Sequence, residues 1–311
     1  MSVKPLRIGT RASALALWQA RHVQGLLGAQ PDAPPVELVH IRTAGDVQNE
    51  VPLWQAGGRA FFTKEIDRAL LEGSVDLAVH SLKDLSTQLE PGITLAATLA
   101  RADPRDALLT RAGVKLAGLP QGARVGTSSL RRRAFLRRAR PDLEHAELRG
   151  NVPTRVERLA GGGDYDAIIL AAAGLARLGL LERVSEFLSP DVFAPAVSQG
   201  IIGICARTGD GATLRWLLPL DDREARLAAS AERALLHRIE GGCQVPLGAL
   251  ATVTDRMLRI HACVCALDGS RHLSAQGAGP ASIADATSLG ERVADELLAR
   301  GAGELIARER G

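Results

Sequence analysis

Short apolar runs typical of strands alternate with helical stretches along most of this chain of 311 residues. Residues 6–10 precede a helical stretch at 14–27, and the apolar run 165–171 follows a helical stretch at 153–160. This alternation is typical of α/β domains built around a parallel sheet. The apolar run 200–206 follows a segment containing prolines, and we expect it to return to the first sheet.

The pattern changes near Asp222. A helical stretch at 223–239 is followed by three segments that alternate like antiparallel strands, 247–253, 257–266 and 272–277, and by an amphipathic stretch at 282–300. We therefore expect three domains. They are an α/β domain of residues 1–100 and 200–219, a second α/β domain of residues 104–195, and a smaller α+β domain of residues 222–311.

Composition excludes several classes of protein. The net charge is only +3, so the chain is not a polycation, and its four cysteines are too irregularly spaced for a disulfide framework. The chain has no P-loop, dinucleotide-binding fingerprint, nucleophile elbow or zinc-protease motif, so ATP, nicotinamide and zinc mechanisms lack support. It also has no apolar leader or membrane-spanning run, and we expect a cytoplasmic protein without a metal.

Two strand-to-helix junctions carry hydroxyl and cationic residues. The first is the segment 10–13, which includes Arg11 and Ser13, and the second is the segment 126–132. A helix N-terminus presents unpaired N–H groups and partial positive charge, so it can hold an anion. The alternative is ordinary helix capping with solvated arginines. Arg149 and Arg155 follow near a third junction, and together these features favour an anion-binding cleft.

The helical repeat limits which arginines of the second junction face a ligand, because successive residues lie about 100° apart. We expect Arg131 and Arg132 to face the ligand. The remaining arginines of this helix, Arg133, Arg137 and Arg138, are expected in solvent.

Lys83 and Asp84 directly follow an apolar strand expected over residues 75–81. Charged residues at the carboxyl end of such a strand lie where α/β active sites collect. Asp84 could stabilise a developing cation, and the alternative is a surface salt bridge with Lys83. His80, within the strand, is expected to be a core residue.

Cys243 lies after two glycines and before Val245 and Pro246, in a loop between a helix and a strand. Glycines permit unusual backbone dihedrals, and a thiolate in such a loop is a good nucleophile toward carbon. The alternative is a small residue without a role. Cys263 and Cys265 alternate on one expected strand and so share a face, but two ligands do not make a zinc site, and we expect both in the core. Cys205, in an apolar run, is also expected in the core.

Taken together, these segments resemble the porphobilinogen deaminase family in order through nearly the whole chain. The similar segments are RIGTRASALALWQA, AGGRAFFTKEID, VDLAVHSLKDL, DPRDALL, VGTSSLRR, LRGNVPTR, YDAIILAAAGLARLGL and EGGCQVPLGA. The chain departs from the family pattern at Gln55 and Arg59, where lysine is common, and at Ser198, where glycine is usual.

The resemblance implies a hydroxymethylbilane synthase, a transferase of tetrapyrrole (haem, chlorophyll or corrin) biosynthesis. Such an enzyme condenses four porphobilinogen units into linear hydroxymethylbilane and releases ammonia. The resemblance also implies a dipyrromethane cofactor bound covalently through Cys243. The first two of the three expected domains should resemble periplasmic binding proteins. The resemblance implies, in addition, a monomer whose partner is the small substrate porphobilinogen, without nucleic acid or membrane.

The resemblance further assigns roles to individual residues. Asp84 is the catalytic residue. The cofactor-binding residues are Cys243, Lys83, Asp84, Thr127, Ser128, Ser129, Arg131, Arg132, Arg149 and Gly150. The substrate-binding residues are Arg11, Ser13, Phe62, Arg149, Arg155, Arg177 and Gln199. Residues 47–60 resemble the family's mobile loop over the cleft.

Two other functions remain as alternatives. A two-lobed, non-catalytic anion-binding protein would explain the helix termini but not Cys243. A nucleic-acid binder using residues 124–140 would need interleaved aromatic residues or widespread basic charge, whereas Phe135 is the single aromatic of that stretch.

Overall fold

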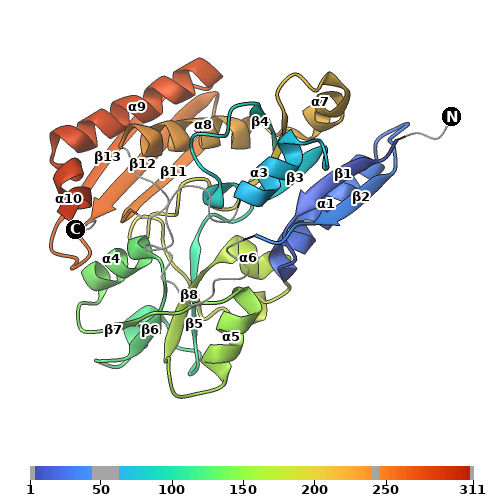
Figure 1. The fold of residues 1–311 in the computed structure, drawn as a ribbon. Helices are drawn as coiled ribbons and strands as arrows, with labels where there is room; N and C mark the ends of the chain where they lie inside the picture. Colours follow the sequence, from blue (N-terminus) through green and yellow to red (C-terminus); the bar gives the residue numbers. More distant parts are fainter. Residues whose placement is uncertain (1–3, 44–62, 240–244, 309–311) are drawn as a thin grey trace. The chain divides into compact units, whose positions relative to one another are not determined.

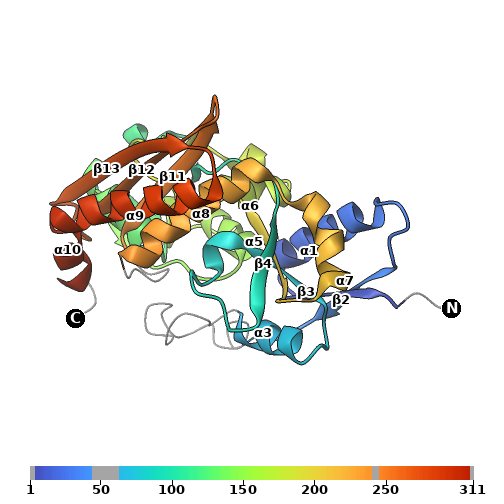
Figure 2. The same ribbon diagram turned by 90° about the horizontal axis from the view of Figure 1, so that it is seen from above.

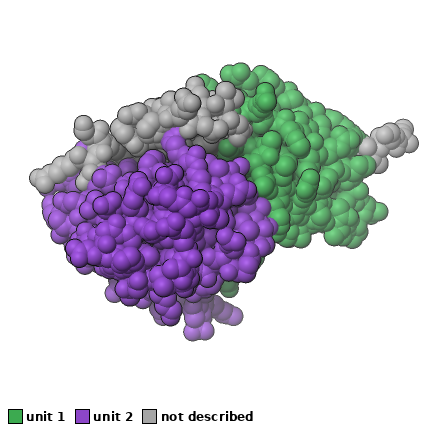
Figure 3. All heavy atoms as spheres, turned by 90° about the horizontal axis from the view of Figure 1, so that it is seen from below, with its two compact units in different colours: residues 1–101, 201–226 green, residues 102–200, 227–311 purple. Residues whose placement is uncertain are grey.

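A computed structural model describes residues 4–43, 63–239 and 245–308. The chain divides into two compact units (Figure 3). Unit 1 comprises residues 1–101 and 201–226, and unit 2 comprises residues 102–200 and 227–311.

Unit 1 is built on a five-stranded sheet with the order β2-β1-β3-β10-β4. Its strands are β1 (Leu6–Thr10), β2 (Val36–His40), β3 (Leu77–Ser81), β4 (Ile93–Thr98) and β10 (Ile202–Arg207). β1 is parallel to β2 and β3, whereas β10 is antiparallel to β3 and β4. The expected return of residues 200–206 to the first sheet is therefore confirmed.

Among the described residues of unit 1, three helices accompany this sheet: α1 (Ala14–Gly28), α3 (Lys64–Leu71) and α7 (Gly211–Leu217). Leu6 and Ile8 alternate along β1 and pack with Ala20 and Val23 of α1 in one apolar cluster. The period of two in the strand and of about 3.6 in the helix thus place both apolar faces in the same core.

Unit 2 contains a second five-stranded sheet, with the order β7-β6-β8-β5-β9. Its strands are β5 (Asp106–Thr110), β6 (Arg124–Gly126), β7 (Glu144–Ala146), β8 (Ala167–Ala171) and β9 (Glu186–Phe187). One face packs against α4 (Leu130–Ala139) through Phe135 and Leu136. The other face packs against α5 (Val152–Ala160) and α6 (Ala172–Arg177).

The two sheets share one strand order. In unit 1 the parallel strands β2, β1 and β3 are followed across the sheet by the antiparallel strand β10 and the edge strand β4. In unit 2 the parallel strands β7, β6 and β8 are followed in the same way by the antiparallel strand β5 and the edge strand β9. The antiparallel strand of unit 1 is β10, which follows the second sheet in sequence, and that of unit 2 is β5, which precedes the rest of its sheet. The expectation of parallel sheets was wrong in this respect, because both sheets are mixed.

A third sheet, also in unit 2, is antiparallel and has the order β11-β12-β13. It consists of β11 (Leu247–Thr254), β12 (Met257–Cys265) and β13 (His272–Pro280), as the alternating pattern predicted. One apolar cluster joins its residues with those of α8 (Arg223–Arg238), α9 (Ile283–Ala299) and α10 (Ala302–Arg308). Figures 1 and 2 show α9 lying along β12 and β13. Because unit 2 holds this sheet and the second one, the division into separate domains of residues 104–195 and 222–311 stays a prediction.

Among the described residues, no helix is both long enough and apolar enough to cross a membrane.

Candidate functional site

The first predicted junction lies at the carboxyl end of β1. Ser13 is the N-cap of α1, and its hydroxyl accepts a hydrogen bond from the backbone N–H of Ala16 at 3.4 Å. Arg11 is half-buried two residues before this cap. The structure thus confirms the helix start predicted from the sequence and places a guanidinium group beside it.

The carboxyl end of β3 lies at the same edge of the sheet, because β3 is a parallel neighbour of β1. A 3₁₀ turn over Leu82–Asp84 follows directly, with Lys83 half-buried and Asp84 exposed. The predicted residues Arg11, Ser13, Lys83 and Asp84 therefore come together at one sheet edge of unit 1. In α/β sheets this is the edge at which ligands bind.

His80 lies in β3 and is buried, as predicted. Burial, with a smaller contribution from the positive charge of Arg11, lowers the pKa of His80 from 6.5 to about 4. Its Nε2 atom is buried and has no hydrogen-bond partner among the described residues. His80 is therefore neutral at physiological pH.

The second junction belongs to unit 2. Thr127 is buried, and its N–H donates to the carbonyl of Ala146 at 2.9 Å. The hydroxyl of Ser128 donates to the carbonyl of Leu148. Ser129 is the N-cap of α4, because its hydroxyl accepts a hydrogen bond from the N–H of Arg132 at 3.4 Å.

Arg131 and Arg132 are buried, and both bind Asp106, which is fully buried at the start of β5. Arg131 Nη1 lies 2.7 Å from Asp106 Oδ2, and Arg132 Nη2 lies 2.8 Å from Asp106 Oδ1. Burial raises the pKa of Asp106, but the two guanidinium charges outweigh this effect and hold the pKa below its ordinary value. Burial lowers the pKa of Arg131.

Asp106 is not among the site residues predicted from the sequence, although it lies within the segment DPRDALL that supports the resemblance. The remaining arginines of α4 were placed only partly correctly. Arg138 is exposed, whereas Arg133 and Arg137 are half-buried because the helix packs on the sheet.

The third junction places Arg149, Gly150 and Arg155 near the start of α5. Gly150 has a φ of 108°, which favours glycine, and its carbonyl accepts a hydrogen bond from Arg155 Nε at 2.7 Å. Arg149 is half-buried, with its Nε 3.8 Å from Glu147 Oε1. Arg149 follows β7 by three residues, so it lies beyond the strand end rather than at it.

Arg177 is the last residue of α6, and Gln199 directly precedes Gly200. Arg177 Nη2 donates to the carbonyl of Gly200 at 2.7 Å, and burial lowers the pKa of Arg177 to about 10. Gln199 is buried, and its Nε2 donates to the carbonyl of Pro104 and to Asp106 Oδ1 at 2.7 and 3.0 Å. Gln199 thus joins the Asp106 group.

Several predicted residues lie outside the described part of the chain. They are Cys243 with its two preceding glycines, Phe62 and the segment 47–60. Cys205, Cys263 and Cys265 are buried, as predicted. Burial raises the pKa of Cys263 to about 12 and that of Cys265 to about 11, which disfavours their thiolates. Among the described residues, no group of three or more histidine, cysteine or acidic side chains could hold a metal ion.

Comparison with known proteins assigns the family. The family model described as "Porphobilinogen deaminase, dipyromethane cofactor binding domain" matches residues 6–215, and "Porphobilinogen deaminase, C-terminal domain" matches residues 226–299. The chain belongs to the porphobilinogen deaminase family. A porphobilinogen deaminase of Syntrophotalea carbinolica is 50% identical over 307 residues, covering 99% of this chain and 96% of the relative. One of Roseiflexus castenholzii is 51% identical over 302 residues, covering 97% and 98%.

One solved structure shows a distant likeness. The methionine binding protein MetQ covers 70% of this chain and 89% of its own, with 13% identity and a TM-score of 0.42. The family assignment therefore depends on the sequence matches.

Proposed function

We propose that this chain condenses four porphobilinogen units head to tail into linear hydroxymethylbilane, with release of ammonia, in tetrapyrrole biosynthesis. The observation that carries the proposal is the match of both porphobilinogen deaminase family models in order along the chain. The cationic residues support it physically, because every pyrrole unit of this pathway carries two carboxylates that need fixed positive charge.

The donor set of unit 2 fits a dipyrromethane cofactor. Two buried guanidinium groups share one carboxylate, so the group of Asp106, Arg131 and Arg132 holds a surplus positive charge. Ser129 adds a hydroxyl and the N-terminus of α4 adds its dipole. When bound, the cofactor supplies the pyrrole carbon from which the chain is extended.

We assign the covalent attachment to Cys243. Of the other cysteines, Cys205 is buried in β10, and the raised pKa values of Cys263 and Cys265 keep both as thiols at neutral pH. A thioether requires a reactive and accessible sulfur. The two glycines before Cys243 are consistent with such a site.

The remaining binding roles follow the anion-binding features of each unit. Lys83, Asp84, Thr127, Ser128, Ser129, Arg131, Arg132, Arg149 and Gly150 bind the cofactor. Arg11, Ser13, Phe62, Arg149, Arg155, Arg177 and Gln199 bind the substrate side chains and rings. Arginine suits this role because its planar fork holds a carboxylate through two hydrogen bonds.

Asp84 is the catalytic residue of the proposed reaction. Loss of ammonia from porphobilinogen breaks the aminomethyl C–N bond and leaves a cation conjugated with the pyrrole nitrogen. A ring carbon of the bound chain then forms the new carbon–carbon bond to this methylene carbon, and that ring carbon loses its proton. The carboxylate of Asp84, exposed after a buried strand, stabilises positive charge in both steps.

We also propose a cytoplasmic monomer that needs no metal or nucleic acid, with residues 222–311 as a separate domain that presents Cys243.

The mass of the intact purified protein tests the proposal. Wild type should be heavier than its sequence by two deaminated pyrrole units and should consume porphobilinogen. Cys243→Ser should stay folded and lose the added mass and the activity, whereas the matched control Cys263→Ala, a buried cysteine of β12, should keep both. An active wild type without added mass would contradict the covalent cofactor.

A further inference from the structure

Asp106 is the centre of a buried polar group in unit 2. Its carboxylate accepts five hydrogen bonds, two from Arg131, two from Arg132 and one from Gln199. Four of these reach Oδ1, at 2.8–3.2 Å. All four side chains are buried, with Asp106 at 0% exposure. Such a set of bonds fixes both guanidinium planes, because each plane is defined by two or more donors at once.

The charge of this group is not balanced by its own members. Two guanidinium groups carry two positive charges, Asp106 carries one negative charge, and Gln199 is neutral. A surplus charge at this depth is costly unless an anion accompanies it. One ligand carboxylate would neutralise the group.

The donors of this group are also incompletely used. A guanidinium has five N–H donors. Arg131 gives three hydrogen bonds to described residues, two to Asp106 and one to the carbonyl of Ala194. Arg132 also gives three, two to Asp106 and one to the carbonyl of Ile169. Each guanidinium thus has two further N–H groups for a ligand carboxylate.

We propose that Asp106 is a positioning residue, which orients Arg131 and Arg132 and leaves them one net positive charge for a single carboxylate of the bound pyrrole chain. The inference rests on the proposed function, since the ligand is the pyrrole chain. Asp106 itself does not contact the reacting atoms. It acts by fixing the donors that hold the chain, so its loss leaves the reactive carbon poorly oriented.

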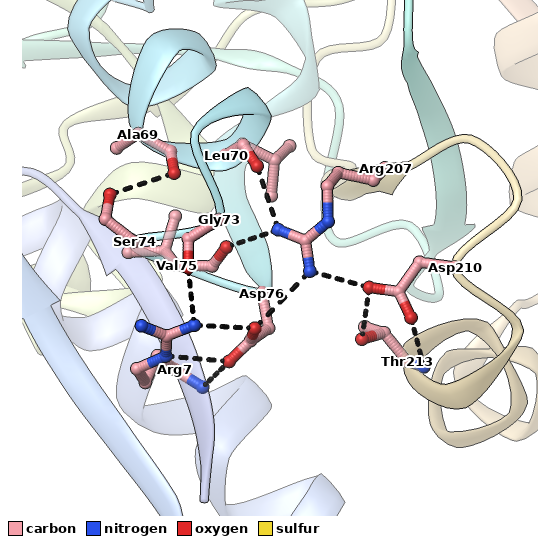
Figure 4. A network of polar contacts seen from close by, with 10 residues as sticks. All are labelled: Arg7, Ala69, Leu70, Gly73, Ser74, Val75, Asp76, Arg207, Asp210 and Thr213. Carbon is pink, nitrogen blue, oxygen red and sulfur yellow. Dashed lines mark hydrogen bonds and ion pairs between the residues drawn. The ribbon is translucent and has the colours of Figure 1, made fainter.

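A purely structural role is the competing explanation, and unit 1 offers a matched control. Asp76 is also a buried aspartate with two arginine partners, Arg7 at 2.9 Å and Arg207 at 3.4 Å (Figure 4). Arg207 also binds Asp210, which caps α7 through Thr213. No partner of Asp76 has a proposed role in binding or catalysis. Asp76→Asn therefore shows how much stability and turnover are lost when a buried aspartate that binds two arginines loses its charge outside the candidate site.

The experiment compares Asp106→Asn, Asp106→Glu and Asp76→Asn with wild type. Each protein is loaded with preformed hydroxymethylbilane, its adduct is confirmed by intact mass, and kcat and KM are measured for each folded holoenzyme. Asp106→Asn should lower kcat on the order of 10- to 100-fold through lost orientation, with KM changed less than about threefold. Asp76→Asn should keep both constants while losing stability.

The conservative variant separates charge from position. Asp106→Glu keeps the charge but moves the carboxylate by one methylene, so it should recover stability and only part of kcat. Failure of folded Asp106→Asn to retain the adduct would also support the proposal.

Other outcomes would overturn it. Normal kcat and KM in folded, loaded Asp106→Asn would leave Asp106 with a structural role only, as would unfolding of both Asp106 variants. A wild type that neither carries an adduct nor consumes porphobilinogen would instead defeat the proposed function, whatever the variants do.

Discussion

The backbone N–H of Ser198 donates to Glu232 Oε2 at 2.6 Å, so a buried carboxylate of α8 holds a residue with a φ of 61°. The other oxygen of Glu232 accepts the N–H of Ala251, in β11, at 2.7 Å. One side chain thus connects α8, β11 and the turn before Gln199. Ser198 is fully buried, and its hydroxyl has no hydrogen-bond partner among the described residues.

Replacing Ser198 by glycine should stabilise the protein. Glycine adopts a positive φ without the steric cost of a side chain, and the change removes a buried hydroxyl that lacks a partner. We expect the free energy of unfolding to rise by about 1 kcal/mol, after the entropy cost of glycine is included. Denaturant unfolding measures it. Ser198→Ala, which removes only the hydroxyl, should gain less, and an equal gain would show that the backbone is not strained.

Gly290 of α9 should not tolerate a methyl group. A Cβ at this position would lie 2.1 Å from the carbonyl oxygen of Ala231 in α8, a backbone atom that cannot move aside alone. Gly290→Ala should therefore lower the free energy of unfolding by about 1–3 kcal/mol or more, despite the better helix propensity of alanine. Gly25→Ala in α1 is the control, since its Cβ would meet nothing within 4 Å. It should be neutral or stabilising by up to about 1 kcal/mol, and a similar loss in both variants would refute the packing explanation.

His80 should make stability depend on pH in the weakly acidic range. The unfolded chain binds a proton at this histidine below about pH 6.5, whereas folded His80 stays neutral down to about 4. The unfolded state therefore holds more protons in this window, and the free energy of unfolding falls as the pH decreases, by about 3 kcal/mol at most. Unfolding measured between pH 7.5 and about 4.5 should show a shallower fall in His80→Leu. The control is His237→Leu, at an exposed position, which should leave the fall in the free energy of unfolding as it is in wild type. If the fall were also unchanged in His80→Leu, the pH dependence would not come from His80.

Local signals explain which parts of the fold could be predicted. Ser13 and Ser129 cap helices through hydroxyl–backbone bonds that span only three residues, and apolar periodicity placed β1, β3 and the three strands of the last sheet. β5 was not predicted, because a short run such as its five buried residues is compatible with a strand or with a buried helix. In addition, its partner strand β8 lies some sixty residues later in the sequence.

In the candidate site, too, local features could be predicted and distant contacts could not. Arg131 and Arg132 were recognised because they lie at the start of a helix, which the sequence indicates. Their binding to Asp106 was not predicted, since Asp106 is 25 and 26 residues away from them in sequence. Tertiary pairing of a buried carboxylate with a given arginine has no local signature, and the sequence offers 38 cations as partners.

Arg155 should serve turnover rather than stability. It is half-buried, and its Nε bonds the carbonyl of Gly150, so its loss should change the melting temperature little. Loss of a charge-assisted bond to a substrate carboxylate should lower kcat/KM by about 10- to 150-fold, equivalent to about 1.5–3 kcal/mol. Arg155→Leu should therefore be folded and slow. Arg158→Leu, an exposed position on the same helix, should retain normal kinetics, and equal kinetics in the two variants would exclude the binding role.

Asp84→Asn should abolish most turnover without unfolding the protein. Asp84 is exposed at the end of its 3₁₀ turn, so the amide should fit the same space and leave the buried face of β3 intact. The substitution removes the charge that stabilises the conjugated cation formed when ammonia leaves. Losing such a group typically costs on the order of 10²–10⁴ in rate.

Cofactor assembly uses the same chemistry, so an inactive Asp84→Asn protein could simply lack its primer. The variant should therefore be loaded with preformed hydroxymethylbilane, and the adduct should be confirmed by intact mass before kcat is measured. Glu90→Gln, an exposed carboxylate in the segment after the same turn, controls for the general loss of a negative charge and should keep wild-type kcat. Near-normal kcat in loaded Asp84→Asn would remove Asp84 from catalysis, because the electrostatic contribution cannot then depend on its carboxylate.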